Sequence, residues 1–147
     1  MRKLKIAGIV VAVLAVASYA SFQIFFRTAV PSYEGTLTID GLGSKVEVRT
    51  DEYGIPHIFA ENDLDLFFAQ GYVTARERMF QMEITRLAGR GELSSLFGEA
   101  TIEKDKFLKT VGIHRIAKAG YRAMSAETRA IIDAYAAGVN AYIRDAK

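Results

Sequence analysis

The first 26 residues pair a basic start with a long apolar segment. From residue 6 to residue 26, 17 of the 21 side chains are apolar, and the exceptions are small or uncharged: Gly8, Ser18, Ser21 and Gln23. Three basic residues precede this segment: Arg2, Lys3 and Lys5. A membrane-spanning helix needs about 20 apolar residues, whereas the core of a secretory signal needs about 7–15.

The segment is compatible with both a spanning helix and a signal-peptide core. Residues 6–26 fit a spanning helix, whereas residues 6–17, followed by the small-residue pattern Ser18-Tyr19-Ala20, fit a signal with its cleavage site. Residues 1–26 are therefore predicted to be a cleaved signal peptide or an uncleaved transmembrane signal-anchor, with the N-terminus in the cytoplasm. A buried core helix is disfavoured because the segment is apolar on every face.

Short alternating segments follow a predicted linker over residues 27–34. Residues 36–40 and 45–49 alternate in the manner of strands, with a glycine-containing turn at residues 41–44 between them. Residues 57–60 supply a third short strand after Pro56. The pattern predicts a hairpin or a three-stranded meander. Such a small unit is marginal in water, so its apolar face needs a partner surface.

The remaining sequence has a helical period. Asn62 is a good N-cap with Asp65 three residues later, and the helix is predicted to run to about Leu87 before Gly89-Arg90-Gly91. One apolar stripe follows steps of three and four: Leu64, Phe68, Tyr72, Ala75, Met79 and Met82.

Four further helical segments are predicted. They cover residues 93–97, 101–108, 113–124 and a last segment capped by Ser125. The last segment reaches Lys147 without the Gly or Pro that follows most helices, so we expect the chain to continue in a larger protein. The fold class expected is α+β: an N-terminal signal or anchor helix, a small β-hairpin and then mostly α-helix.

Composition narrows the function classes. Hydrophobic residues make up 50% and charged residues 24%, which excludes a disordered chain. The absence of cysteine excludes disulfides, thiolate metal sites and a cysteine nucleophile. The net charge of +2 arises in the leader, because residues 1–33 hold four basic and no acidic residues. The other 114 residues hold 15 basic and 17 acidic residues, a net charge of −2, so no nucleic-acid partner is expected.

Candidate chemistry is sparse. His57 and His114 lie far apart, and structural or surface roles are favoured for both. No serine lies in a G-x-S-x-G motif, and the Gly41-Leu42-Gly43 sequence lacks the third glycine and the helix of a dinucleotide site. The carboxylates of Glu99, Glu103 and Asp105 are expected to be surface charges rather than a calcium site.

Two other features have structural and functional interpretations. Four arginines of the long predicted helix suggest a phosphate-binding face: Arg76, Arg78, Arg86 and Arg90. Glutamates are interleaved with them, which favours a solvated, ion-paired helix. The Gly43-Ser44 pair is of the type that self-processing hydrolases cut, but its position between predicted strands favours an ordinary turn.

The order of the motifs resembles the penicillin acylase (penicillin amidase) family, a family of self-processing N-terminal-nucleophile amidohydrolases. The matching blocks are Gly41-Leu42, VEVRTDEYGIPHIFA at 46–60, DLFFAQGYV at 65–73, Ala75, RMFQME at 78–83, GRGEL at 89–93, FGE at 97–99, Asp105 and AYAAGVNA at 134–141. The chain departs from the family where Thr74-Ala75-Arg76-Glu77-Arg78 replaces the usual His-Ala-Gln-Asp-Arg, and at Lys109, where arginine is common. These departures leave the subfamily open.

The resemblance implies an exported precursor that cuts itself into a short N-terminal chain and a long C-terminal chain. The whole protein would have a four-layer αββα core, formed downstream. The nucleophile would be the serine at the new N-terminus of the long chain, with its own α-amino group as the base and an oxyanion hole on the same chain. Residues 35–147 match only the first part of the short chain, so the catalytic serine is expected downstream of Lys147.

No catalytic, cofactor-binding or metal-binding residue is therefore assigned within this sequence. The resemblance leaves room for a structural calcium ion in the full-length protein. The implied reaction is hydrolysis of a linear amide between an acyl group and an amine, in a β-lactam side chain or an acyl-homoserine lactone. The implied partners are the long chain, a small amide substrate and, if the leader is uncleaved, the membrane. The implied location is the periplasm, free or membrane-anchored.

Two alternatives remain. A membrane-anchored helical interaction module explains the leader and the amphipathic helices but not the order of the motifs. A truncated, inactive acylase has the same sequence and no activity.

Overall fold

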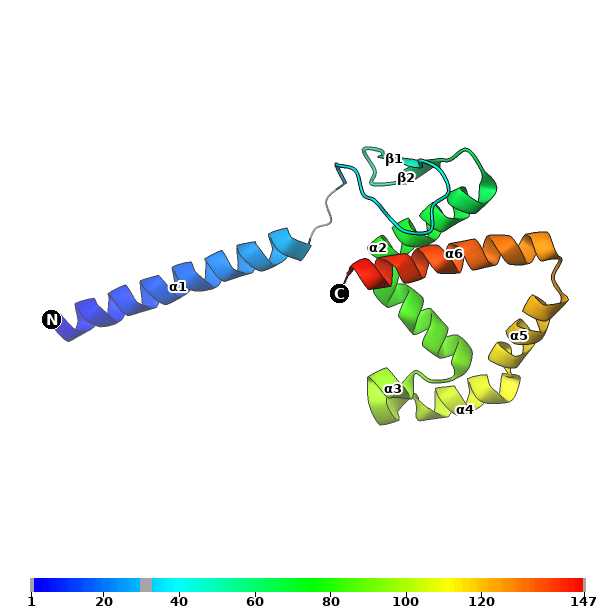
Figure 1. Ribbon diagram of the computed structural model, residues 1–147. Coiled ribbons are helices and arrows are strands. Elements are labelled where there is room, and N and C mark those ends of the chain that lie inside the picture. The colour runs from blue at the N-terminus through cyan, green and yellow to red at the C-terminus, as the bar shows by residue number, and fades with distance from the viewer. Residues whose placement is uncertain (1, 30–32, 147) are drawn as a thin grey trace. The chain divides into compact units, whose positions relative to one another are not determined.

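The computed structural model describes residues 2–29 and 33–146, which form two compact units, Met1–Thr36 and Leu37–Lys147. The first unit contains helix α1, Arg2–Ala29 (Figure 1). Its segment Gly8–Arg27 has a mean hydropathy of 2.2 and none of it is buried within the chain, so α1 is long and apolar enough to cross a membrane. The helix continues three residues into the predicted linker, and residues 30–32 of that linker lie outside the described part.

A two-stranded antiparallel hairpin begins the second unit. Strand β1, Glu47–Thr50, pairs with β2, Pro56–Phe59, with Val48 opposite Ile58. The turn between the strands is organised by Asp51, whose Oδ1 accepts the backbone N–H groups of Tyr53 at 3.0 Å and Ile55 at 2.9 Å. The predicted hairpin is thus confirmed, with its turn at residues 51–55.

The predicted strand at residues 36–40 is wrong, and the hairpin turn does not lie at residues 41–44. The backbone there is committed to the following helix, because the N–H groups of Gly43 and Ser44 both donate to the Asp65 carboxylate at 2.8 Å. Leu37 and Ile39 alternate like strand residues, but Leu37 is 66% exposed, whereas Ile39 packs on the helical core together with Leu42. The described part of the chain therefore has a hairpin and no meander.

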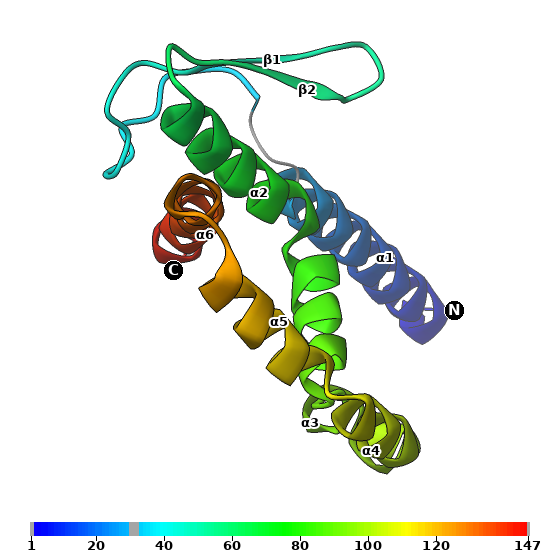
Figure 2. The same ribbon diagram turned by 90° about the vertical axis from the view of Figure 1, so that its right-hand side faces the viewer.

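Helix α2, Asp63–Arg90, follows with the predicted caps. The Asn62 side chain accepts the N–H of Asp65 at 2.9 Å, and Gly91 ends the helix in the left-handed conformation at φ +64°. Arg78 departs from helical geometry (φ −135°, ψ 21°), and Figure 2 shows the resulting bend in α2. The sequence pattern gave no sign of this bend.

The bend divides the predicted apolar stripe. Before it, Phe68, Tyr72 and Ala75 are buried, whereas Met79 and Met82 beyond it are only half-buried. Leu64, at the start of the stripe, is half exposed.

The chain then returns through short helices to a long one. These are α3, Ser94–Phe97, the 3₁₀ turn η1, Gly98–Thr101, α4, Ile102–Val111, α5, Ile113–Ala123, and α6, Ala126–Asp145. Ser125 caps α6 as predicted, with its Oγ accepting the N–H of Thr128 at 3.1 Å. Figures 1 and 2 both show α6 lying across the first half of α2.

The crossing of α2 and α6 is made at two glycines. A Cβ added at Gly71 would overlap the carbonyl oxygen of Tyr135, and one added at Gly138 would overlap the carbonyl oxygen of Phe68. The two backbones therefore touch directly. This approach creates the small core of Phe68, Tyr72 and Ala141, with the rings of Tyr72 and Tyr142 packed edge to face at 5.6 Å.

We expect Gly71→Ala or Gly138→Ala to separate the two helices. Each added methyl group meets backbone that cannot rotate away, so the free energy of unfolding should fall by about 3 kcal/mol. Urea denaturation followed by circular dichroism measures the change.

The matched control is Gly89→Ala in α2, where an added Cβ meets nothing within 4 Å. That substitution should stabilise the helix by about 0.5–1 kcal/mol, because alanine loses less backbone entropy than glycine on folding. Equal effects of all three substitutions would show that the backbones do not touch.

Candidate functional site

Asp65 joins the loop before the hairpin to the start of α2. Its carboxylate accepts the N–H groups of Gly43 and Ser44, and the side-chain amide of Asn62 donates to Oδ2 at 2.7 Å. Asp65 is only 4% exposed. The N–H of Gly43 and then the Asn62 amide lower the pKa of Asp65, outweighing the opposing effect of burial. The sequence indicated a capping role for Asp65 and missed its contact with residues 43 and 44.

Asp105 likewise accepts hydrogen bonds from two backbone N–H groups of a distant segment. Its two carboxylate oxygens accept the N–H groups of Leu93 at 2.8 Å and Ser94 at 2.7 Å. Burial raises the pKa of Asp105, but the hydrogen bonds from Ser94 and Leu93 outweigh it, so the pKa lies below its usual value. The carboxylate holds the start of α3 against α4.

This corrects the expectation that Asp105 is a surface charge. Asp105 is 5% exposed, whereas Glu99 and Glu103 are exposed, and Glu103 pairs with Lys106 at 2.6 Å. The three carboxylates do not converge. Among residues 2–29 and 33–146, no group of three or more His, Asp or Glu side chains is placed to hold a metal ion.

The two histidines lie in different settings. His57 on β2 places Nε2 3.1 Å from Oδ2 of Asp51, and this contact is the main reason that the pKa of Asp51 is lowered. The pair is exposed and closes the hairpin turn. His114 is exposed on α5. Within the described residues, neither histidine is hydrogen-bonded to a hydroxyl group that could act as a nucleophile.

The arginines of α2 form an ion-paired face, as the charge pattern predicted. Arg86 pairs with Glu83 and Arg90 with Glu92, each at 2.7 Å. Arg76 pairs with Glu77 at 3.0 Å. Most of the positive charge is therefore neutralised locally.

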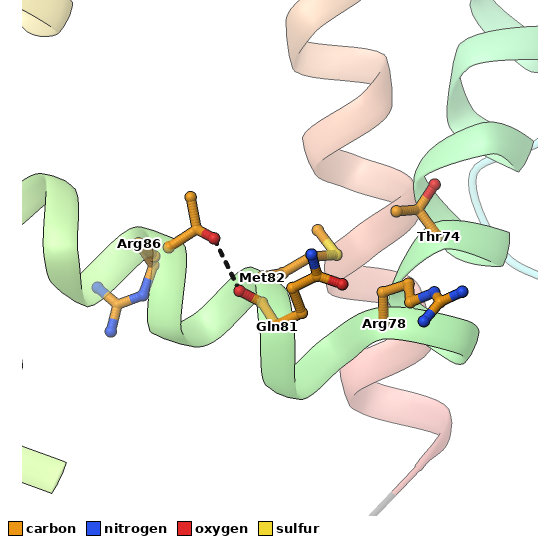
Figure 3. Close-up of a pocket in the computed structure, with 6 residues that line it drawn as sticks. Thr74, Arg78, Gln81, Met82 and Arg86 are labelled. Atoms are coloured by element: carbon orange, nitrogen blue, oxygen red, sulfur yellow. Dashed lines mark hydrogen bonds between the residues drawn. The ribbon is translucent and has the colours of Figure 1, made fainter. Parts of the chain in front are cut away.

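A shallow hollow of about 560 Å³ lies beside the bend in α2 (Figure 3). Its lining combines two cations with uncharged polar groups and one thioether: Thr74, Arg78, Gln81, Met82, Thr85 and Arg86. Thr85 Oγ1 donates to the carbonyl oxygen of Gln81 at 2.9 Å, and Gln81 and Met82 lie between the two arginines. The lining offers hydrogen-bond donors but no nucleophile paired with a base.

An uncovered apolar surface is the other conspicuous feature. Helix α5 places Ile113, Ile116, Ala117 and Gly120 at helical spacing on one face, and none of its residues is buried. Ile116 is 64% exposed, and Phe107 on the neighbouring α4 is 66% exposed. Side chains of this size at this spacing normally pack against another surface.

Comparison with known proteins gives a consistent result. The penicillin amidase family model matches residues 45–147. The chain is 37% identical over 117 residues to the penicillin acylase 2 proenzyme of Pseudomonas sp. (strain SE83), covering 80% of this chain and 15% of that protein. It is 35% identical over 118 residues to the acyl-homoserine lactone acylase QuiP of Pseudomonas aeruginosa, covering 80% of this chain and 14% of that protein.

The solved structures agree. The thermostable penicillin G acylase from Alcaligenes faecalis superposes with a TM-score of 0.62 and 31% sequence identity, over 69% of this chain and 54% of that chain. Sequence and backbone therefore both place the hairpin and helices within the fold of N-terminal-nucleophile acylases. The chain belongs to the penicillin amidase family, which confirms the resemblance inferred from its motifs. It spans about 15% of the length of the curated relatives it matches.

The lowered pKa values of Asp65 and Asp105 predict acid sensitivity. A carboxylate with a lower pKa in the folded state stabilises the fold above its unfolded pKa of about 3.9 and loses this contribution as the pH falls through the folded pKa. The free energy of unfolding should therefore decrease steadily as the pH is lowered from about 5 to about 2. Urea unfolding at a series of pH values measures this.

Asp65→Asn should destabilise the fold at pH 7 and flatten the pH dependence, leaving the part due to Asp105. Asp63→Asn is the control, because Asp63 occupies the same helical turn but is exposed. An unchanged pH profile in Asp65→Asn would contradict the role given to that carboxylate.

Proposed function

We propose that this chain is the first part of the short chain of an exported, self-processing acylase that hydrolyses a linear amide between an acyl group and an amine. The supporting observation is the family match, which runs from β1 to the end of the chain while covering about 15% of the relatives' length. The apolar N-terminal helix α1 supports export to the periplasm.

On this proposal the chemistry belongs to the downstream long chain. A serine at the new N-terminus attacks the amide carbonyl, its own α-amino group accepts the proton, and an acyl-enzyme forms as the amine leaves. An oxyanion hole stabilises the tetrahedral intermediates, and water then releases the acid. The relatives' names, penicillin acylase and acyl-homoserine lactone acylase, support an acyl amide as the proposed substrate class.

The role proposed for the present residues is to pack the short chain on the long chain. Two exposed apolar surfaces would be buried by this packing. They are the face of α5 with Ile113 and Ile116, and the side chain of Phe107 on α4. The rest of the same precursor is the proposed occupant, because the relatives are several times longer than this chain. The polar faces of these helices stay solvated.

Expression of the full-length gene tests the proposed activity. We expect mass spectrometry to show two chains from one precursor. We also expect release of amine from a panel of phenylacetyl amides and long-chain acyl-homoserine lactones. A single uncut chain without activity would favour the interaction module or the inactive acylase.

Ile116→Asp tests the proposed packing. A carboxylate on the face that contacts the long chain should be desolvated there, so self-processing should slow and two-chain protein should decrease by about tenfold or more. Pulse-labelling with separation of precursor and processed chains measures the effect.

His114→Asp is the matched control, because it adds the same charge to the polar side of α5. It should process at the wild-type rate. Equal processing of both variants would remove the α5 face from the interface.

A further inference from the structure

The acylase proposal uses helix α1 as support for export, but it does not say whether the helix is cleaved or retained. The segment Gly8–Arg27 of α1 contains 20 residues, carries no acidic residue and meets its first basic residue only at Arg27. At 1.5 Å per residue, 20 helical residues span about 30 Å, the thickness of the hydrocarbon core of a bilayer. A signal-peptide core of about 7–15 residues spans only part of that thickness.

The polar side chains inside this segment fit a lipid environment. Gln23 carries the largest of them, and its Nε2 donates to the hydroxyl of Tyr19 one turn earlier at 2.7 Å. This contact satisfies one amide N–H and the tyrosine oxygen within the same helix. The cost of placing these groups in hydrocarbon is thereby reduced.

The apolar surface continues past the cleavage pattern at residues 18–20. Phe22 and Phe26 stack with ring centroids 4.3 Å apart, and Phe25 meets Phe26 edge to face at 5.6 Å. With Ile24, these rings extend the apolar helix by about 9 Å beyond Ala20. The pattern therefore lies within the hydrocarbon length rather than after it.

The backbone at the same pattern is helical. α1 runs without a break through residues 18–20 to Ala29. A peptidase binds its substrate in an extended conformation, and unwinding this turn inside hydrocarbon would leave backbone N–H and C=O groups without partners. Length and composition thus disfavour cleavage after Ala20, and the continuous helix is compatible with a spanning segment.

We infer that α1 is retained as an uncleaved anchor whose occupant is the lipid bilayer, with the basic residues Arg2, Lys3 and Lys5 on the cytoplasmic side and Arg27 at the outer surface. The body from residue 33 onward is then tethered to the outer face of the membrane. This inference concerns location and is independent of amide hydrolysis.

The test is carbonate extraction of membranes from cells that express the full-length protein. Peptides from residues 33–146 should be enriched in the washed membrane pellet by about tenfold or more, because a spanning helix does not dissociate. Mass spectrometry should detect an intact peptide across the Ala20–Ser21 bond. A soluble protein whose N-terminus is Ser21 would overturn the inference.

A pair of matched variants makes the test specific. The triple substitution Phe22→Ser, Phe25→Ser and Phe26→Ser shortens the apolar core to that of a signal, so the bond after Ala20 should now be cut and the protein released. The same three positions changed to leucine keep the core apolar and should leave the protein in the membrane. Identical fractionation of both triple variants would contradict the role of apolar length. Neither readout uses amide hydrolysis, so failure here leaves the acylase proposal standing.

Discussion

The close approach of α2 and α6 at Gly71 and Gly138 is the constraint on which the second unit depends. Because the two backbones touch, Phe68 and Tyr72 of α2 reach Ala141 of α6 and form a core without a large sheet behind it. The segment around Ile39 and Leu42 then packs on this core, and Asp65 fixes its backbone. The chain between the crossing helices has less to pack against, and α5 accordingly has no buried residue.

Local signals predicted most of the helical fold, and contacts between distant residues explain what they missed. The caps at Asn62, Gly91 and Ser125 act within one helical turn, so their residue types are enough to locate the helix ends. The backbone N–H groups that donate to Asp65 lie 21 and 22 residues away, and those that donate to Asp105 lie 11 and 12 residues away, so no local pattern reveals that these carboxylates are buried. The segment at 36–40 alternates in sequence like a strand, but only Ile39 packs inward and Leu37 is exposed, so the alternation did not reflect the packing of this loop.

For the candidate site, the sequence predicted mainly that residues 35–147 contain no catalytic or metal-binding group. The ion-paired arginines and the separate histidines followed from charge pattern and spacing, but the hollow beside Arg78 depends on a bend that no Pro or Gly marks. The buried carboxylates hold loops, whereas large apolar side chains are exposed on the hairpin, α2 and α3 as well as on α4 and α5. These exposed side chains are the observation behind the proposed packing on a larger partner, and the chain spans about 15% of its relatives' length.

Hydroxyl-radical footprinting of the full-length protein tests that dependence most directly, because it reports the solvent exposure of individual side chains. Phe107 and Ile116 are 66% and 64% exposed in the described chain by itself. If the downstream chain covers them, both side chains should react much more slowly in the folded full-length protein than in the urea-unfolded protein. Reaction at the rate of the unfolded protein would contradict the account.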